Sequence, residues 1–500
     1  MKKFLKTMCL VLVFILMFTA VVPAFAADSQ SFACPEVYVH GFATGEIYTE
    51  KDGVVAELGV PDADTLMATA KEKLLPAALA FAADGDVKKL GASIADVVNT
   101  AFADWFNNPD GSAANNSSAN FEYPAASSLK KNSRVAFRYD WRGNPIEIAA
   151  QLNDCINYII ESTGCEKVAL TAHSLGSVVI LTYLSIYGDD KVMGVVFDTP
   201  AMDGLISVGE IFCGKTSFNV GSVEALFKMI ISETEYEELL TSIVDIFTMA
   251  GINQSISELL NGAYDELGVV LMEKTLFPLF GSWLSVWAMI PDEYIDEAME
   301  YSFDSGVYPG DYEALKANVM EYNEKVRANK KQTLLDFDKE GRVVVFSRYG
   351  FSAVPMTEEW AILSDTVIET RSNSLGATTA PFGDSFSDEY LEGKDMKYIS
   401  PDKTIDASTC LFPEKTWFIK NTSHQETKVT SKYYTQLLFG KEEATCENAE
   451  LSRFMLYDRE NNVLVNDNTE PVKAEKLTVF QRIFNFVKAL IDKLLALFKK

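Results

Sequence analysis

The residues best suited to covalent chemistry lie at Ala172-His173-Ser174-Leu175-Gly176, between an apolar strand predicted over 167–171 and an apolar helix predicted over 178–186. This arrangement is typical of a nucleophile elbow, a sharp turn that exposes a serine hydroxyl, with alanine in place of the usual first glycine. Small residues on both sides of Ser174 let the turn pack, and the N–H of Leu175 begins the helix and faces the position of an oxyanion. We therefore predict that Ser174 is a nucleophile and that Gly176 supports its turn.

A second oxyanion donor is predicted in the loop after the strand at 37–39, where His40-Gly41-Phe42 follows. Such sites take one N–H from the residue after the nucleophile and another from an earlier loop. Gly41 permits close approach of the backbone, so the N–H of Phe42 is the expected donor. A simple turn at the end of the strand is the alternative interpretation.

The general base follows by elimination, because the chain contains only three histidines. His40 belongs to the predicted oxyanion loop, and His173 should point away on the elbow. His424 remains, just after a strand predicted over 416–419, and its late position gives the chain order serine, acid, histidine. We predict that His424 is the base.

Two carboxylates are candidates for the acid that orients this histidine. Asp365 lies in Ser364-Asp365-Thr366-Val367-Ile368, in a loop beyond the strand predicted over 342–346. Asp198 ends the strand predicted over 192–197. We favour Asp365 and keep Asp198 as the rival.

Alternating strands and helices should position these residues. Strands over 37–39, 134–139, 167–171, 192–197 and 342–346, with helices over 148–159 and 178–186, predict a mostly parallel sheet covered on both faces. Ligands bind at the carboxyl ends of such strands, where the candidate residues fall. Helical insertions are expected at about 45–130 and 203–335. The second is the expected cap, and Trp283 and Trp287 belong to its core or to an underside that meets lipid.

The two ends of the chain have their own signals. A basic start, an apolar run over 8–22 and Ala24-Phe25-Ala26 predict a signal peptide over 1–26, so a secreted or cell-surface bacterial protein is expected. A retained membrane anchor is the alternative. The main α/β domain should span 27–460, followed by a polar linker over 461–475. Residues 476–500 predict a basic amphipathic helix that contacts a membrane surface or docks on the enzyme or a second copy.

Composition excludes several classes of protein. With 48% hydrophobic residues in 500, the chain is neither disordered nor a small disulfide scaffold. The charge of 44 − 71 = −27 argues against nucleic acid as a partner. Loss of three signal lysines makes it −30, and setting aside the +5 of residues 476–500 leaves −35 on the body.

Six cysteines remain after residue 26, and an even number in an exported chain permits disulfides. Proximity in sequence suggests Cys155 with Cys165 and Cys410 with Cys446, while free buried thiols are the alternative. No Cys-x-x-Cys pair occurs, so a zinc cluster is not expected, and three histidines leave little room for a His-rich metal site. No cofactor is predicted.

A family resemblance joins several of these segments. His40-Gly41, Tyr139-Asp140-Trp141-Arg142, the serine motif and Thr199-Pro200 resemble the lecithin:cholesterol acyltransferase-like lipases of the α/β-hydrolase superfamily, over roughly 35–200 and 340–425. Asp365-Thr366-Val367-Ile368 is similar to the segment that carries the acid in that family. Ala172 and Asp198 stand where these proteins commonly have glycine.

The resemblance implies an α/β-hydrolase fold, a serine acyl-enzyme, lipid esters as acyl donors and no metal. We therefore predict an exported serine hydrolase that acts on lipid or small esters. A lipid O-acyltransferase with the same triad is the first alternative. A non-catalytic binding protein on a hydrolase fold is the second, although an intact serine, histidine and aspartate set argues against it.

Overall fold

The computed structural model describes residues 34–51, 54–58, 87–119, 122–217, 219–222, 272–305, 312–340, 342–353, 359–440 and 442–470, with a few isolated positions between 69 and 270. The predicted signal peptide (1–26) and the predicted basic helix (476–500) lie outside these residues. Within the described part of the chain, no helix has the length and apolar character needed to cross a bilayer.

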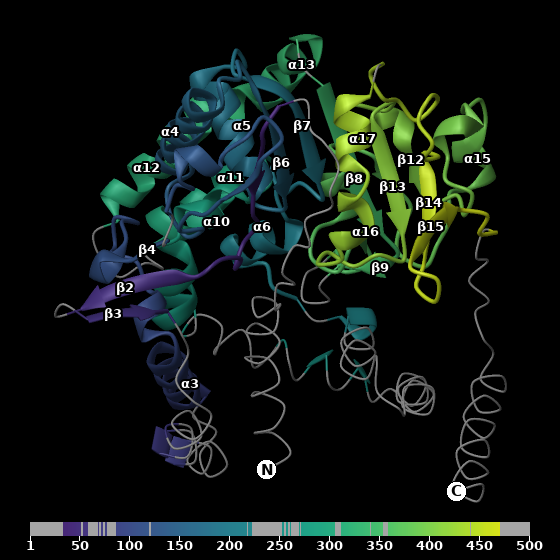
Figure 1. Cartoon of the computed structure of the whole chain (residues 1–500). Coiled ribbons are helices and arrows are strands. Elements are labelled where there is room, and N and C mark those ends of the chain that lie inside the picture. Colours follow the sequence, from purple (N-terminus) through teal and green to yellow (C-terminus); the bar gives the residue numbers. More distant parts are fainter. Residues whose placement is uncertain are drawn as a thin grey trace, which may run out of the picture.

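An eight-stranded sheet forms the centre of the molecule (Figure 1). Every pair of neighbouring strands is parallel except the last, in which β15 runs antiparallel to β14. The strands in spatial order are β5 (Arg134–Phe137), β1 (Glu36–Val39), β6 (Val168–His173), β7 (Val192–Asp198), β8 (Arg342–Tyr349), β13 (Thr416–Lys420), β14 (Phe454–Asp458) and β15 (Val463–Asn466). The predicted mostly parallel sheet is confirmed.

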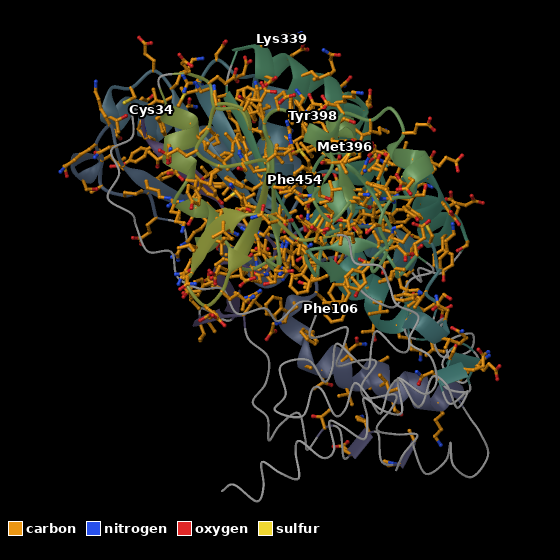
Figure 2. All side chains as sticks on the ribbon, turned by 90° about the vertical axis from the view of Figure 1, so that its right-hand side faces the viewer. Cys34, Phe106, Lys339, Met396, Tyr398 and Phe454 are labelled. Carbon is orange, nitrogen blue, oxygen red and sulfur yellow. The ribbon has the colours of Figure 1, made fainter. Side chains whose placement is uncertain are left out.

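Helices cover both faces of this sheet, as predicted. Successive residues of a strand point to opposite faces, and β7 shows the result: Val195 and Phe197 enter one apolar core while Val196 enters the other. The first core also contains α4 (Pro145–Thr163), α5 (Gly176–Tyr187) and α13 (Lys330–Glu340). The second contains α16 (Lys428–Ser431) and α17 (Tyr434–Phe439). Side chains fill the space around the sheet, Phe454 among them (Figure 2).

The two helices beside the serine motif differ in a way that their sequences explain. Helix α4 is amphipathic: Asn144 caps its N-terminus by accepting from the N–H of Ile146, and Gly164, with φ of 66°, ends it. Helix α5 is buried on nearly all sides from Gly176 to Leu184, because it lies against the sheet, α4 and α13. A helix that is apolar all round belongs in a core.

The first insertion is only partly helical, which corrects the prediction for 45–130. It contains α3 (Val87–Ala101) and a three-stranded antiparallel sheet of β3 (Val54–Glu57), β2 (Ile47–Lys51) and β4 (Ser118–Ala119). Asp52-Gly53, between two runs with β-branched residues, is a hairpin signal that the prediction passed over.

The regular elements described in the second insertion are all helices. It contains α6 (Ile206–Phe212), α10 (Leu284–Ala288), α11 (Ile295–Met299) and α12 (Glu313–Lys325). Trp283 and Trp287 are both buried in the main apolar core. Helix α13 packs on α5 and β8 and so belongs to the layer that covers the sheet. The cap therefore ends a few residues before the predicted 335.

The predicted linker at 461–475 also needs correction. Its residues Val463–Asn466 form β15, which pairs with β14, and the β-branched residues Val463 and Val465 favour a strand. The side chain of Asp467 then accepts a hydrogen bond from the Tyr349 hydroxyl at 3.1 Å. The folded body thus extends to at least residue 467.

The six cysteines after residue 26 are unpaired, so the two suggested disulfides are absent. Burial raises the pKa of the Cys155 thiol to about 12 and has the same effect on Cys446. Thiols with such a pKa are poor nucleophiles. They behave as small apolar side chains in the packed interior.

Candidate active site

Ser174 occupies a strained turn between β6 and α5, as the motif predicts. Its φ of 54° lies in the left-handed region, which serine rarely adopts. Its N–H donates to the carbonyl oxygen of Asp198 at 3.2 Å, and its own carbonyl accepts from the N–H and the hydroxyl of Ser177. The surrounding strands therefore fix the turn, and Ser174 as a whole residue is 5% exposed.

Two glycines make this turn possible. A Cβ at Gly176 would lie 2.2 Å from the carbonyl oxygen of Val39, a clash with backbone that β1 could not relieve. A Cβ at Gly41 would lie 2.9 Å from the Cβ of Ser174. The loop that carries Gly41 and Phe42 is thus pressed against the serine, where an oxyanion donor would have to be. Leu175 stands at the N-terminus of α5, where the first N–H groups of a helix lack acceptors within the helix.

His424 and Asp365 meet although they are far apart in the chain. His424 Nδ1 lies 2.7 Å from Asp365 Oδ2, and both side chains are buried. The N–H of His424 also donates to the carbonyl oxygen of Asp365 at 2.8 Å. A carboxylate at Nδ1 selects the tautomer in which that nitrogen carries the proton. Nε2 is then left as the basic nitrogen.

The carboxylate of Asp365 is held by a turn of its own loop. Oδ1 accepts from the N–H groups of Val367 (3.0 Å) and Ile368 (2.7 Å), while Thr366 between them takes a φ of 87°. Oδ2 accepts from Asn373 Nδ2 at 3.3 Å in addition to His424. These donors hold the carboxylate in place and leave one oxygen directed at the histidine.

Asp198, the rival acid, has different partners. Its Oδ2 forms an ion pair with Arg348 Nη2 at 2.5 Å and accepts from Thr430 Oγ1 at 2.7 Å and from the Tyr434 hydroxyl. Asp198 and Arg348 are both fully buried. Its carboxylate makes no hydrogen bond to His424. The geometry therefore favours Asp365 as the orienting acid.

His173 connects the elbow to the loop of His424. Its Nε2 lies 2.9 Å from the carbonyl oxygen of His424, and the two rings are 4.7 Å apart. Burial lowers the pKa of His173 well below its usual value, and the neighbouring His424 and Arg348 act in the same direction. His173 is therefore a neutral hydrogen-bond donor near the site.

His40 stabilises the predicted oxyanion loop. Its ring stacks on Tyr139 with centroids 4.2 Å apart, and its Nδ1 lies 2.8 Å from the carbonyl oxygen of Gly41. The Tyr139 hydroxyl donates to the carbonyl oxygen of His40 at 2.6 Å. Burial lowers the pKa of His40 to about 4, so it too is neutral near pH 7.

Arg142 joins three segments beside this loop. It forms a bidentate pair with Asp140, and its Nη1 donates to the carbonyl oxygen of Trp105 at 3.0 Å. Trp283 Nε1, from the second insertion, donates to the same oxygen at 3.0 Å. The Phe42 ring packs on Trp141 and Trp283, with centroids 4.4 and 5.8 Å apart. The Tyr-Asp-Trp-Arg motif therefore attaches both insertions to the loop of Phe42.

Three residues of this region were missed from the sequence. Arg348 is a charged residue within a buried strand, a signal that was readable in the run Val343–Tyr349. Glu369 is buried, and its Oε2 accepts from the N–H of Ile206 at 3.1 Å, at the start of α6. Burial raises the pKa of Glu369 to about 7. Nothing in the sequence distinguishes Asn373, which touches Asp365 only because the chain turns back at α14 (Thr370–Asn373).

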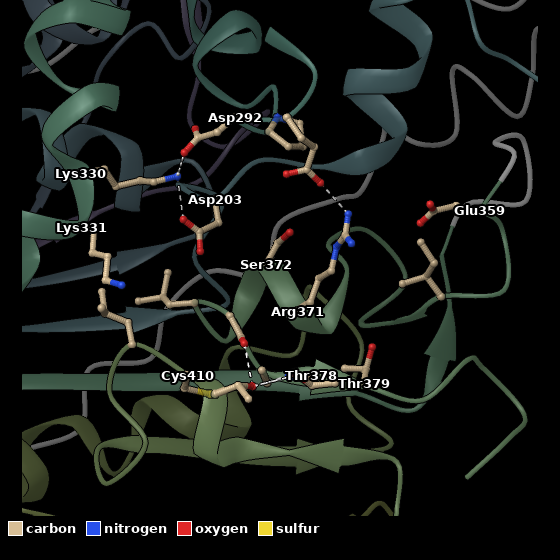
Figure 3. A pocket seen from close by; sticks show the side chains of 18 of the residues that line it. Asp203, Asp292, Lys330, Lys331, Glu359, Arg371, Ser372, Thr378, Thr379 and Cys410 are labelled. Carbon is tan, nitrogen blue, oxygen red and sulfur yellow. Dashed lines mark hydrogen bonds and ion pairs between the residues drawn. The ribbon is translucent and has the colours of Figure 1, made fainter. Parts of the chain in front are cut away.

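A cavity of about 1190 Å³ lies on another side of α14, which contributes Arg371 and Ser372 to its wall. Figure 3 shows Lys330 between Asp203 and Asp292, with Nζ–O distances of 2.8 and 3.1 Å. Neither Ser174 nor His424 lines this cavity. Among the residues that the structure describes, no group of His, Cys, Asp and Glu side chains could hold a metal ion.

Comparison with known proteins agrees with this architecture. A family model described as the alpha/beta hydrolase fold matches residues 103–210, which include β5, β6, β7 and the elbow. No curated protein matches the chain. The sheet and this match together show the α/β-hydrolase fold, and that fold points to a hydrolase.

Solved structures include distant similarities. One is a chain of the Tle4–Tli4 complex, with 14% identity and a TM-score of 0.20, covering 37% of this chain and 49% of that one. Another is LipA from Xanthomonas oryzae, described as a rice cell wall degrading esterase, with 9% identity and a TM-score of 0.17, covering 63% and 84%. The chain thus spans about half the length of the first.

Proposed function

We propose that this protein is a serine hydrolase that cleaves carboxylic esters of lipids through an acyl-enzyme. The observation that carries the proposal is the contact between His424 Nδ1 and Asp365 Oδ2 at 2.7 Å, on a loop bonded to the elbow of Ser174. A serine on a strained elbow, a histidine and a buried carboxylate have one well-understood use together, which is acyl transfer.

The mechanism follows from the roles of these groups. Ser174 Oγ attacks the ester carbonyl while His424 Nε2 takes its proton, and Asp365 stabilises the imidazolium that forms. The N–H groups of Phe42 and Leu175 stabilise the oxyanion. The imidazolium then protonates the departing alcohol, which leaves an acyl-enzyme. Water, activated by His424, attacks this ester and restores Ser174.

Lipid esters are the proposed substrates because the oxyanion side is aromatic. Phe42 and Trp105 are half-buried, and they pack on the buried Trp141 with ring centroids 4.4 and 5.7 Å away. Apolar surface of this kind gains from contact with an acyl chain. The resemblance to lecithin:cholesterol acyltransferase-like lipases supports the same substrate class. An alcohol in place of water would make the enzyme an acyltransferase, the alternative that product analysis decides.

The test compares hydrolysis of p-nitrophenyl esters of increasing chain length by the wild type and two serine variants. Ser174→Ala should abolish turnover. Ser185→Ala, in the same helix, should leave it unchanged, because the Ser185 hydroxyl has no hydrogen-bond partner among the described residues. Equal activity of wild type and Ser174→Ala would overturn the proposal. Products from a phospholipid and a sterol are then separated: free fatty acid indicates hydrolysis, and a new ester indicates acyl transfer.

We also propose that the protein is exported and that residues 476–500 bring it to a membrane surface. The basic amphipathic pattern of that segment supports contact with anionic lipid. Cosedimentation with vesicles of anionic lipid should fall on deletion of 476–500. An N-terminus at residue 27 in protein from the culture medium would support export, and an intact Met1 would contradict cleavage.

A further inference from the structure

Asp198, which is not the predicted triad acid, is hydrogen-bonded to Ser174 and is connected through Arg348 to His424. The backbone carbonyl of Asp198 accepts from the N–H of Ser174 at 3.2 Å, and its side chain pairs with Arg348. Arg348 Nη1 in turn donates to the carbonyl oxygen of His424 at 2.6 Å. One continuous set of bonds therefore runs from the serine through Asp198 and Arg348 to the histidine.

The carbonyl of His424 is held from two sides. Arg348 Nη1 approaches it from β8 and His173 Nε2 from β6, at 2.6 and 2.9 Å. The side chain of His424 is fixed separately, at Nδ1, by Asp365. A histidine whose backbone and ring are both held keeps one orientation of Nε2, the nitrogen that the proposed mechanism uses as the base.

We propose that Asp198 and Arg348 form a positioning pair that holds the His424 loop against the elbow and neutralises the charge behind the imidazole. This inference rests on the proposed function, because it assigns work to the pair only if His424 is the base. Neither member touches the reacting atoms, so both are positioning residues.

The second role of the pair is electrostatic. The fixed positive charge of Arg348 beside His424 would oppose formation of the imidazolium, and Asp198 cancels most of it. His173 adds no charge because burial keeps it neutral. The titratable and charged groups around the His424 loop are Asp365, His173, Arg348, Asp198 behind Arg348, and Glu426, which accepts from the Ser423 N–H and pairs with Arg459.

The bonding of the pair indicates that it is not optimised for stability alone. Asp198 Oδ1 and Arg348 Nε are buried without a hydrogen-bond partner among the described residues. Buried ion pairs gain stability only when their remaining polar atoms are satisfied, and apolar replacements often do as well. The two unsatisfied atoms agree with a pair that acts on the neighbouring candidate site as well as on stability.

The experiment measures kcat, KM, the pH at half-maximal kcat/KM and the melting temperature for three variants. Asp198→Asn leaves the Arg348 charge uncancelled, so the acidic midpoint should move down by about one pH unit, and kcat should fall on the order of 10²-fold with little change in KM. Asp198→Asn with Arg348→Gln removes both charges, so the midpoint should return to the wild-type value. Arg348→Lys keeps the positive charge but loses the guanidinium group that bonds Asp198 and the His424 carbonyl together. Its kcat should therefore fall while the acidic midpoint of kcat/KM stays at the wild-type value.

Asp406→Asn is the matched control. Asp406 is fully buried and also bonds a cation (Lys394, 2.9 Å), a tyrosine hydroxyl (Tyr390, 3.0 Å) and a serine hydroxyl, but in the small sheet of β11 (Thr378–Thr379) and β12 (Ile405–Asp406). The melting temperature of Asp406→Asn should fall, and its acidic midpoint of kcat/KM should stay at the wild-type value. A pair with a merely structural role would behave as this control does.

The outcomes separate the two proposals. A wild-type enzyme without esterase activity overturns the proposed function. An active wild type with an Asp198→Asn variant of unchanged midpoint and kcat overturns the positioning pair alone. If Asp198→Asn does not fold, the test rests on Arg348→Lys and on the double variant Asp198→Asn with Arg348→Gln. Unchanged kcat in both contradicts the inference. Reduced kcat in both, at the wild-type midpoint of kcat/KM, supports it.

Discussion

Two buried aspartates are connected to His424 in this fold, one directly and one through Arg348, and their surroundings differ. Asp365 sits in a turn whose N–H groups and Asn373 satisfy it, and it directs one oxygen at His424. Asp198 lies at the end of β7 and binds a guanidinium and two hydroxyls. The comparison shows that the partner, and not burial or strand-end position, decides what a carboxylate can do.

The comparison predicts that Asp365 matters more for activity and that Asp198 matters more for stability. Asp365→Asn should lower kcat on the order of 10⁴-fold, because the amide stabilises the wrong imidazole tautomer. The fold should persist, since the Asn side chain can still accept from Val367 and Ile368. Ester turnover and the melting temperature, measured on the same samples, check this. A larger loss of kcat in Asp198→Asn than in Asp365→Asn would reverse the assignment of the acid.

Stability should show the opposite order. Asp198→Asn leaves Arg348 buried without its counter-ion, which costs about 3–5 kcal/mol in the free energy of unfolding. Asp365→Asn breaks one charged hydrogen bond and should cost about 1.5–3 kcal/mol. Urea unfolding of both variants checks the ranking. Equal losses would show that the ion pair contributes no more than an ordinary contact.

A third buried carboxyl, Glu369, differs from both aspartates because its contribution to stability should depend on pH. Its folded pKa is raised to about 7 by burial, above the ordinary 4.5, so the folded state binds its proton more tightly. Stability from this group is present below about pH 4.5 and is lost as pH rises through 7. The stability of wild type relative to Glu369→Gln should therefore fall by up to about 3 kcal/mol between pH 4 and pH 8. A difference that stays constant with pH would contradict the raised pKa.

The smallest effect is expected at Asn373, which supports Asp365 from the side. Loss of its hydrogen bond to Asp365 in Asn373→Ala should cost about 1 kcal/mol of transition-state stabilisation, or roughly fivefold in kcat. KM should be unchanged, because the side chain is fully buried behind the acid. Steady-state kinetics over a range of ester concentration checks both values. An effect confined to KM would place Asn373 in substrate binding instead.

The sequence predicted the elements whose pattern is local. The serine elbow was readable from small residues between an apolar strand and an apolar helix, and the structure places Ser174 there with a φ of 54°. The scarcity of histidine led to His424, and the structure brings it to Asp365. Their catalytic roles stay predictions. The mostly parallel sheet is confirmed, since strand and helix alternation leaves few other arrangements.

The rest depends on contacts between distant residues. Asp198 meets Arg348 across adjacent strands and Tyr434 from a helix, and no local pattern encodes such a meeting. The edge strand β15 was missed because its polar surroundings read as a linker, although exposed Val463 and Val465 suit an edge. The two disulfides suggested by proximity in sequence are absent, because all six cysteines after residue 26 are free thiols.

The central claim is that Ser174 is the nucleophile activated by His424 and Asp365. The most direct test is to react the wild type with a fluorophosphonate and to map the adduct by peptide mass spectrometry. The account predicts one adduct, on Ser174, with labelling slowed strongly in His424→Ala and absent in Ser174→Ala. An unlabelled wild type, or an adduct on another serine, would contradict it.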